Sequence, residues 1–185
     1  SGAEFIGVLV IIRSLTTVDL IEVEQVFTHA FSIEEASATY QIIRASISNN
    51  TSDTRLCLGY EKQTNIVGAI AFTLVVFEPD EDMTGYILVP LAVHSDYQQL
   101  EIGTKLIQYG LAHLIAQGVE VLLVYGDPEY YGRFGFDVEL GRHFRPPYAL
   151  EYELGWQAMQ LGTLNFRDRI YPFRCVDELS DPTFW

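Results

Sequence analysis

The chain has 185 residues, of which 25 are acidic and 11 are basic, so its formal net charge is −14. This length is typical of one domain with a sizeable core, and a hydrophobic content of 49% excludes a disordered chain. The acidic charge excludes a protein that coats nucleic acid, because phosphate binding needs a basic surface. The same charge disfavours docking on an anionic membrane surface.

Two cysteines, Cys57 and Cys175, are too few for a framework of several disulfides, so nothing demands an oxidising compartment. The sequence leaves open whether they pair or remain free thiols. The apolar run at 5–12 is too short to span a bilayer and lacks the flanks of a signal peptide. We therefore expect a cytoplasmic protein.

No internal repeat and no shift in composition marks a second domain, so residues 1–185 are predicted to form a single domain. Residues 1–8 carry no weight in this prediction, because the first five are compatible with a vector-derived leader. Residues 141–185 are expected to extend the same domain with less regular structure.

The first half of the chain predicts a strand, two helices and three further strands. Ser32 and Glu35 have the capping-box spacing that begins a helix. Pro90 lies inside the last of these strands and indicates a bulge, since proline cannot donate to the sheet ladder. The expected elements are a strand at 9–13, helices at 17–31 and 33–48, and strands at 55–61, 66–77 and 86–93.

The second half gives clearer signals up to Gly141. Gly118 suits the position that follows a helix, and Asp127 followed by Pro128 predicts the start of a short helix. The expected elements are a helix at 102–117, a strand at 119–125, a short helix at 129–133, a strand after Gly135, a strand at 156–161 and an irregular tail. This order predicts an α+β, or mixed α/β, fold.

A strand, a tight polar loop and a helix with Gly103 and Thr104 in its first turn occupy residues 90–107. Backbone N–H groups at a helix N-terminus carry partial positive charge, and a glycine lets an anion approach closely. The loop therefore suits a phosphate group, although these residues alone favour a purely structural glycine. The fingerprint G-x-G-x-x-G is absent, which argues against a Rossmann cofactor site.

Together with a later block, this stretch resembles the GNAT superfamily of acetyl-CoA-dependent N-acetyltransferases. The run from Leu91 to Tyr97 is similar to the family pattern L-A-V-H-P-x-Y. Gln98, Glu101 and Gly103 stand where the family has Q/R-x-x-G-x-G/A at its pyrophosphate-binding turn. The departure from the pattern is Glu101, which replaces the first glycine.

The later block, residues 126–136, resembles the family segment F-Y-x-K-x-G-F in the form G-D-P-x-Y-Y-x-R-F-G-F of a bacterial branch. The resemblance implies that Tyr131 approaches the cofactor sulfur, where a phenol can protonate the leaving thiolate. The other aromatic residues of the block, Tyr130 among them, are interpreted as core residues. The resemblance spans roughly Ile11 to Phe136.

The resemblance implies a GNAT-like fold, in which a central, mostly antiparallel sheet is flanked by helices. The strand near 86–93 splays from the strand near 119–125, and pantetheine lies in the gap. Acetyl-CoA is the implied co-substrate, and Tyr131 is the implied catalytic residue. The implied cofactor-binding residues are Leu91, Ala92, Val93, Gln98, Gln99, Glu101, Ile102, Gly103 and Thr104.

The predicted acceptor is a primary amine of a small molecule or peptide, which must lose its proton before it attacks. Glu78, His94 and Asp127 are candidate bases, with no ranking among them. The histidines have no metal-ligand spacing with the cysteines, so no metal is predicted. A homodimer is left open.

Two functions are open on the sequence. The first is acetyl transfer from acetyl-CoA to the amine by direct attack in a ternary complex. The alternative is a GNAT-fold binding or sensor module, in which Glu101 impairs the cofactor site and catalysis is weak or absent.

Overall fold

A computed structural model describes residues 7, 9–49, 53–78, 82–166 and 168–185. Residues 1–6 and 8, which include the suggested leader, lie outside the described residues. The main elements are β1 (Val10–Ser14), α1 (Leu20–Ala30), α2 (Ile33–Ser48), β2 (Arg55–Lys62), β3 (Asn65–Phe77), β4 (Thr84–Val93), α3 (Ile102–Ala116), β5 (Val121–Tyr125), α4 (Pro128–Gly132), α5 (Val138–Gly141), β6 (Phe144–Arg145), β7 (Trp156–Gln160) and β8 (Tyr171–Arg174).

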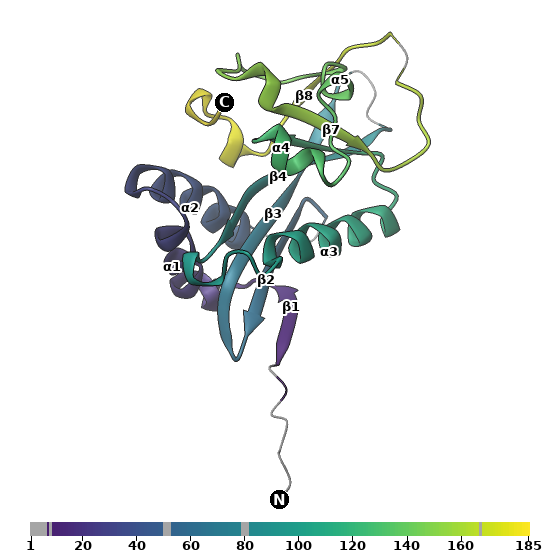
Figure 1. Ribbon diagram of the computed structural model, residues 1–185. Helices are drawn as coiled ribbons and strands as arrows, with labels where there is room; N and C mark the ends of the chain where they lie inside the picture. Colours follow the sequence, from purple (N-terminus) through teal and green to yellow (C-terminus); the bar gives the residue numbers. More distant parts are fainter. Residues whose placement is uncertain (1–6, 8, 50–52, 79–81, 167) are drawn as a thin grey trace, which may run out of the picture.

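One twisted sheet organises the molecule, with the strand order β1-β2-β3-β4-β5-β7 (Figure 1). Along this path only β4 and β5 are parallel, and the other neighbours are antiparallel. Strand β8 also pairs with the end of β3, so residues near the end of the chain join the central sheet. This architecture confirms the predicted α+β fold class with helices on both faces.

The central strand β3 shows why the helices divide between the two faces of the sheet. Ala69 and Ala71 pack with buried residues of α1 and α2, whereas Ile70 and Phe72 pack with α3. Successive residues of a strand point to opposite faces, so one run of apolar residues serves both helical layers. A third cluster of aromatic residues fills the part of the core next to the C-terminal strands.

All six elements predicted for the first half are confirmed; the boundaries shift by at most two residues, except that the helix predicted from residue 17 begins as a 3₁₀ turn and becomes α1 at Leu20. The bulge predicted at Pro90 is present, because Ile70 pairs with Leu91 while Phe72 pairs with Leu88. Two residues of β4 therefore lie opposite one residue of β3. Helix α2 begins where the capping box predicts, but the Ser32 side chain makes no capping hydrogen bond.

Two predictions for the C-terminal third are wrong. The chain does not continue as a strand after Gly135, because Asp137 Oδ1 accepts hydrogen bonds from the N–H groups of Glu139 (2.6 Å) and Leu140 (3.2 Å) and thereby caps α5. Only one bridge, between Asp137 and Ala158, remains of the expected strand. The tail is also more regular than predicted, since it contains β8 and two short 3₁₀ turns.

The structure settles the state of the two cysteines. Cys57 in β2 is buried, Cys175 after β8 is half-buried, and both are free thiols. Across the residues that the structure describes, no helix has the length and apolar character needed to cross a membrane.

Candidate active site

The parallel strands β4 and β5 separate partway along their length and form a fork. Their pairing covers Gly85–Leu88 and Val121–Val124 and ends there. Beyond Leu88, β4 passes through its bulge and continues to Val93, paired with β3 but not with β5. The separation predicted from the family resemblance is therefore present.

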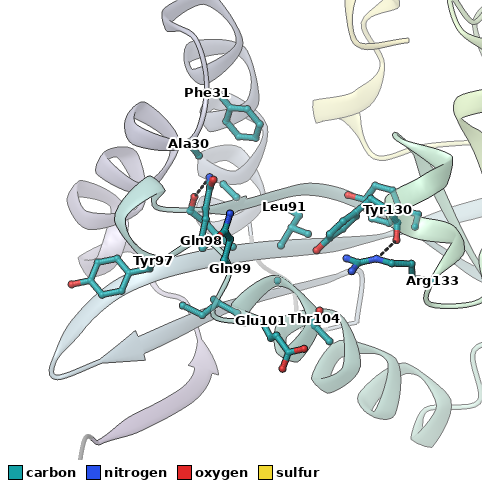
Figure 2. A pocket seen from close by; sticks show the side chains of 15 residues that line it. Ala30, Phe31, Leu91, Tyr97, Gln98, Gln99, Glu101, Thr104, Tyr130 and Arg133 are labelled. Atoms are coloured by element: carbon teal, nitrogen blue, oxygen red, sulfur yellow. Dashed lines mark hydrogen bonds between the residues drawn. The ribbon is translucent and has the colours of Figure 1, made fainter.

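A pocket of about 530 Å³ opens at this fork, and we call it the fork pocket (Figure 2). Its walls come from the end of β4, the loop into α3, the first turn of α3 and helix α4. All ten residues predicted for the site line this one pocket: Leu91, Ala92, Val93, Gln98, Gln99, Glu101, Ile102, Gly103, Thr104 and Tyr131. Their individual roles remain predictions.

Sequence reasoning missed five residues that also line the fork pocket: Ala30, Phe31, Tyr97, Tyr130 and Arg133. The first two end α1, which no motif connects to the loop before α3. Tyr130 and Arg133 lie in the same block as Tyr131, so the signal for them was present. The interpretation of Tyr130 as a core residue is incomplete, because it packs in the core and also faces the pocket.

The start of α3 presents unpaired backbone donors to this pocket. The Lys105 N–H group donates to the Glu101 carbonyl (3.0 Å), so the N–H groups of Ile102, Gly103 and Thr104 precede the first helical bond. A helix start also carries partial positive charge. Gly103 is buried, and a Cβ there would lie 2.6 Å from Tyr130 Oη, so glycine is what lets the Tyr130 hydroxyl pack against the first turn of α3.

Glu101 has the backbone conformation that its position requires. Its φ of 59° and ψ of 24° are left-handed, and Gln99 in the same loop also has a positive φ of 66°. Such conformations favour glycine, which agrees with the glycine expected at residue 101. The Glu101 side chain is exposed, and its carboxylate points away from Leu91 and Tyr130 (Figure 2). The loop therefore keeps its turn despite the substitution.

Tyr131 is held firmly at the edge of the fork. Its ring lies against Gly126, where a Cβ would come within 2.5 Å of Tyr131 Cε2, and stands edge-on to Phe136 at 5.7 Å between centroids. Burial raises the pKa of the Tyr131 phenol, and Tyr130 and Asp127 add to the shift. The phenol is therefore protonated at neutral pH and can act as a hydrogen-bond donor.

Tyr130 differs from Tyr131 in its surroundings, although the two rings touch at 5.0 Å between centroids. Burial raises the pKa of Tyr130 as well, but the charge of Arg133 opposes the shift. The Arg133 guanidinium lies 4.8 Å from the centre of the Tyr130 ring (Figure 2). Among the described residues that line the fork pocket, Arg133 is the one cation and Glu101 the one carboxylate.

The end of β4 carries a carbonyl that already has a partner. Gln98 Nε2 donates to the Val93 oxygen at 3.2 Å (Figure 2). A carbonyl oxygen has two lone pairs, so it can accept a second hydrogen bond from a ligand in the pocket. The Gln98 amide therefore marks the direction from which an amide donor could reach β4.

None of the three candidate bases lines the fork pocket. The Asp127 carboxylate accepts from the Glu129 N–H group (2.9 Å) as the cap of α4. Glu78 forms an exposed ion pair with Arg174 at 2.6 Å. His94 Nδ1 accepts from the Asp96 N–H group in the loop after β4. Within the described residues, no three His, Cys, Asp or Glu side chains are grouped to hold a metal ion.

Comparisons with known proteins bear directly on this site. The model of the acetyltransferase (GNAT) family matches residues 20–136, a range that contains the fork and both walls of the pocket. The chain belongs to the GNAT acetyltransferase family. The family resemblance found in the sequence is thereby confirmed.

Three of the similar GNAT proteins come from bacteria. The uncharacterized N-acetyltransferase YjhQ of Escherichia coli K12 is 29% identical over 163 residues, which cover 86% of this chain and 88% of YjhQ. The crystal structure of Escherichia coli YhbS in complex with CoA has a TM-score of 0.80 at 20% identity and covers 95% of this chain and 94% of its own. A GNAT acetyltransferase from Brucella melitensis in complex with acetyl-CoA has a TM-score of 0.66 at 28% identity, covering 84% and 90%.

Proposed function

We propose that this GNAT protein transfers the acetyl group of acetyl-CoA to a primary amine of a small molecule or peptide by direct attack in a ternary complex. The observation that carries the proposal is the fork pocket, where free N–H groups at the start of α3 and the Tyr131 phenol line one cavity. Acetyl-CoA has both groups that these features suit, a pyrophosphate and a thioester.

The pyrophosphate is assigned to the first turn of α3 and the preceding loop. Backbone N–H groups and the helix dipole bind phosphate without cationic side chains, which allows a protein with a net charge of −14 to bind a polyanion. Arg133 supplies the single cation of the pocket. The Brucella melitensis relative, 28% identical, has a solved complex with acetyl-CoA and supports the choice of ligand.

The pantetheine arm is assigned to the open edge of β4, where Leu91 and Val93 offer backbone groups beyond the β4–β5 pairing. In the transfer step, the neutral amine nitrogen forms a bond to the thioester carbon and the carbon–sulfur bond breaks. The electron pair goes to sulfur, which accepts a proton from the Tyr131 phenol, and the amine releases its extra proton to water. Backbone N–H groups near the carbonyl oxygen stabilise the developing negative charge.

The acidic charge of the chain supports a cationic acceptor through the rate of encounter. A strongly acidic surface raises the encounter rate of cationic molecules, and most primary amines are protonated at neutral pH. The amine must then lose its proton before attack, and none of Glu78, His94 and Asp127 touches the pocket. We therefore assign this deprotonation to a water-mediated path.

The alternative, a binding or sensor module, depends on damage to the loop by Glu101. The left-handed backbone and the exposed carboxylate of Glu101 argue against such damage. The proposal therefore favours an active enzyme.

Two measurements test the proposed function. Isothermal titration with acetyl-CoA should give saturable one-to-one binding, and a panel of primary amines should give thiol release that depends on both the amine and acetyl-CoA. Binding without thiol release for any amine would favour the sensor module. No binding up to millimolar acetyl-CoA would overturn the proposal.

A further inference from the structure

A second cavity, which we call the C-terminal pocket, is lined by residues between Val138 and Ile170. It has a volume of about 700 Å³, and its walls include Phe144, Tyr148, Trp156, Arg142 and Arg145. It shares no lining residue with the fork pocket. Its size and its mainly apolar walls with a few polar groups are typical of small-molecule sites.

Hydrogen bonds fix the walls of this pocket. Trp156 Nε1 donates to the carbonyl oxygens of Gly141 (3.0 Å) and Phe144 (2.8 Å), so the indole is buried with its polar atom satisfied. Tyr148 Oη donates to the Ser180 carbonyl at 2.9 Å. Strand β6 is paired with β8, which holds Phe144 opposite Tyr171. A cavity with pre-formed walls needs little reorganisation to accept a ligand.

Apolar side chains at the mouth of the C-terminal pocket are exposed to water. Leu154 is 54% exposed and Ile170 is 60% exposed, although both line the cavity. An apolar group placed between them and the Trp156 ring would remove this surface from water, which is favourable. The pocket therefore suits a ligand with an apolar body.

The charged residues of the C-terminal pocket indicate the polar part of the ligand. Arg142 and Arg145 line it, with Glu153 as the one carboxylate among the lining residues. Arg142 already has an exposed ion pair with Glu139 at 2.8 Å. Arg145 makes no hydrogen bond or ion pair with the described part of the chain, which leaves its guanidinium available. Two guanidinium groups against one carboxylate at an apolar cavity favour an organic anion, although the chain as a whole has a net charge of −14.

We propose that the C-terminal pocket binds a small carboxylate with an aromatic or aliphatic body. The carboxylate pairs with Arg145, in the bidentate geometry that guanidinium groups favour, and the body lies among the apolar lining residues next to the buried Trp156 ring. Leu154 and Ile170 cover it from the mouth of the pocket. This site is independent of the fork pocket and of acetyl transfer.

The probe for this site is 2-naphthoate, with 2-naphthylmethanol as a neutral compound of the same shape. The chain has two tryptophans, so a ¹H–¹⁵N spectrum contains two indole N–H signals, and the Trp185→Phe variant assigns the signal of Trp156. We expect naphthoate to shift the Trp156 signal saturably and to bind about tenfold more tightly than the alcohol. No saturable shift at millimolar naphthoate, or equal affinity for the two compounds, would overturn the proposal.

Arginine variants locate the carboxylate. Arg145→Gln should weaken naphthoate binding about five- to tenfold, whereas Arg145→Lys, which keeps the charge, should weaken it about twofold. Arg44→Gln is the charge-matched control, because Arg44 is exposed on α2 and, within the described residues, hydrogen-bonds only Gln41, at 3.4 Å. Equal weakening by Arg145→Gln and Arg44→Gln would refute the assignment to Arg145, and displacement of naphthoate by CoA would refute a separate site.

Discussion

The fork pocket and the C-terminal pocket offer an anion two different kinds of partner within the same acidic chain. In the fork pocket the donors are backbone N–H groups at the start of α3, and a single guanidinium, that of Arg133, lines the cavity. In the C-terminal pocket two guanidinium groups, those of Arg142 and Arg145, line an apolar cavity.

Because their donors differ, the two sites should respond differently to substitutions. A site made from backbone depends on the path of the chain and on the space left by glycine, so an added methyl group should damage it more than a lost charge. A site made from arginines should respond in the opposite way. The Arg145 variants described above test the arginine site, and the predictions below test the backbone site, starting with the chemistry that only the fork pocket supports.

Tyr131→Phe should give the largest effect, a fall in kcat of about 100-fold or more, because the leaving thiolate loses its proton donor. Tyr130→Phe is the matched control, since it removes a hydroxyl from the neighbouring ring that lines the same pocket. We expect it to change kcat less than about fivefold. Steady-state thiol release with the best amine measures both, and the reverse order would transfer the acid role to Tyr130.

Gly103→Ala should weaken acetyl-CoA binding about tenfold, because the new Cβ would come within 2.6 Å of Tyr130 Oη and force that side chain to shift within the fork pocket. Gly132→Ala is the control, since a Cβ at Gly132 meets nothing within 4 Å. Isothermal titration measures both affinities. Equal affinity for Gly103→Ala and wild type would mean that the phosphate binds elsewhere.

Glu101→Gly should tighten acetyl-CoA binding about threefold, because it removes a carboxylate beside a polyanion and removes the strain of holding a non-glycine residue in a left-handed conformation. It should also raise the free energy of unfolding by about 1 kcal/mol. Glu101→Gln separates the two causes, since it removes the charge and keeps the strained backbone. Titration calorimetry and chemical denaturation measure these effects, and weaker binding by the glycine variant would show that the Glu101 side chain helps to hold the ligand.

The smallest effect concerns pH. Because burial raises the pKa of Tyr131, the phenol should stay protonated beyond about pH 10, the ordinary pKa of tyrosine. Loss of the Tyr131 proton should therefore cause no fall in kcat between about pH 7 and pH 10. If kcat nevertheless falls with rising pH in this range, the same fall should also be present in the Tyr131→Phe variant. A fall in kcat with an apparent pKa below 10 that is present in the wild type and absent from Tyr131→Phe would contradict the account.

The sequence was informative where local chemistry decides the structure. The Gly103 loop, the Asp127 cap and the apolar strands could be read from short patterns, and the family resemblance placed all ten predicted site residues around one pocket. The bulge at Pro90 followed from the chemistry of proline alone.

The rest depended on contacts between residues far apart in the chain. Ala30 and Phe31 reach the fork pocket only because α1 packs beside β4, which no local pattern encodes. The strand expected after Gly135 does not form, because Asp137 instead caps the short helix α5. The C-terminal pocket combines residues from several short segments that gave no periodic signal.

A crystal structure with acetyl-CoA tests the central claim most directly. The account predicts pyrophosphate oxygens within hydrogen-bond distance of the N–H groups of Ile102, Gly103 and Thr104, with the thioester sulfur next to Tyr131 Oη. A cofactor whose phosphates contact Arg142 and Arg145 in the C-terminal pocket, or whose sulfur lies against Tyr130 and away from Tyr131, would contradict it.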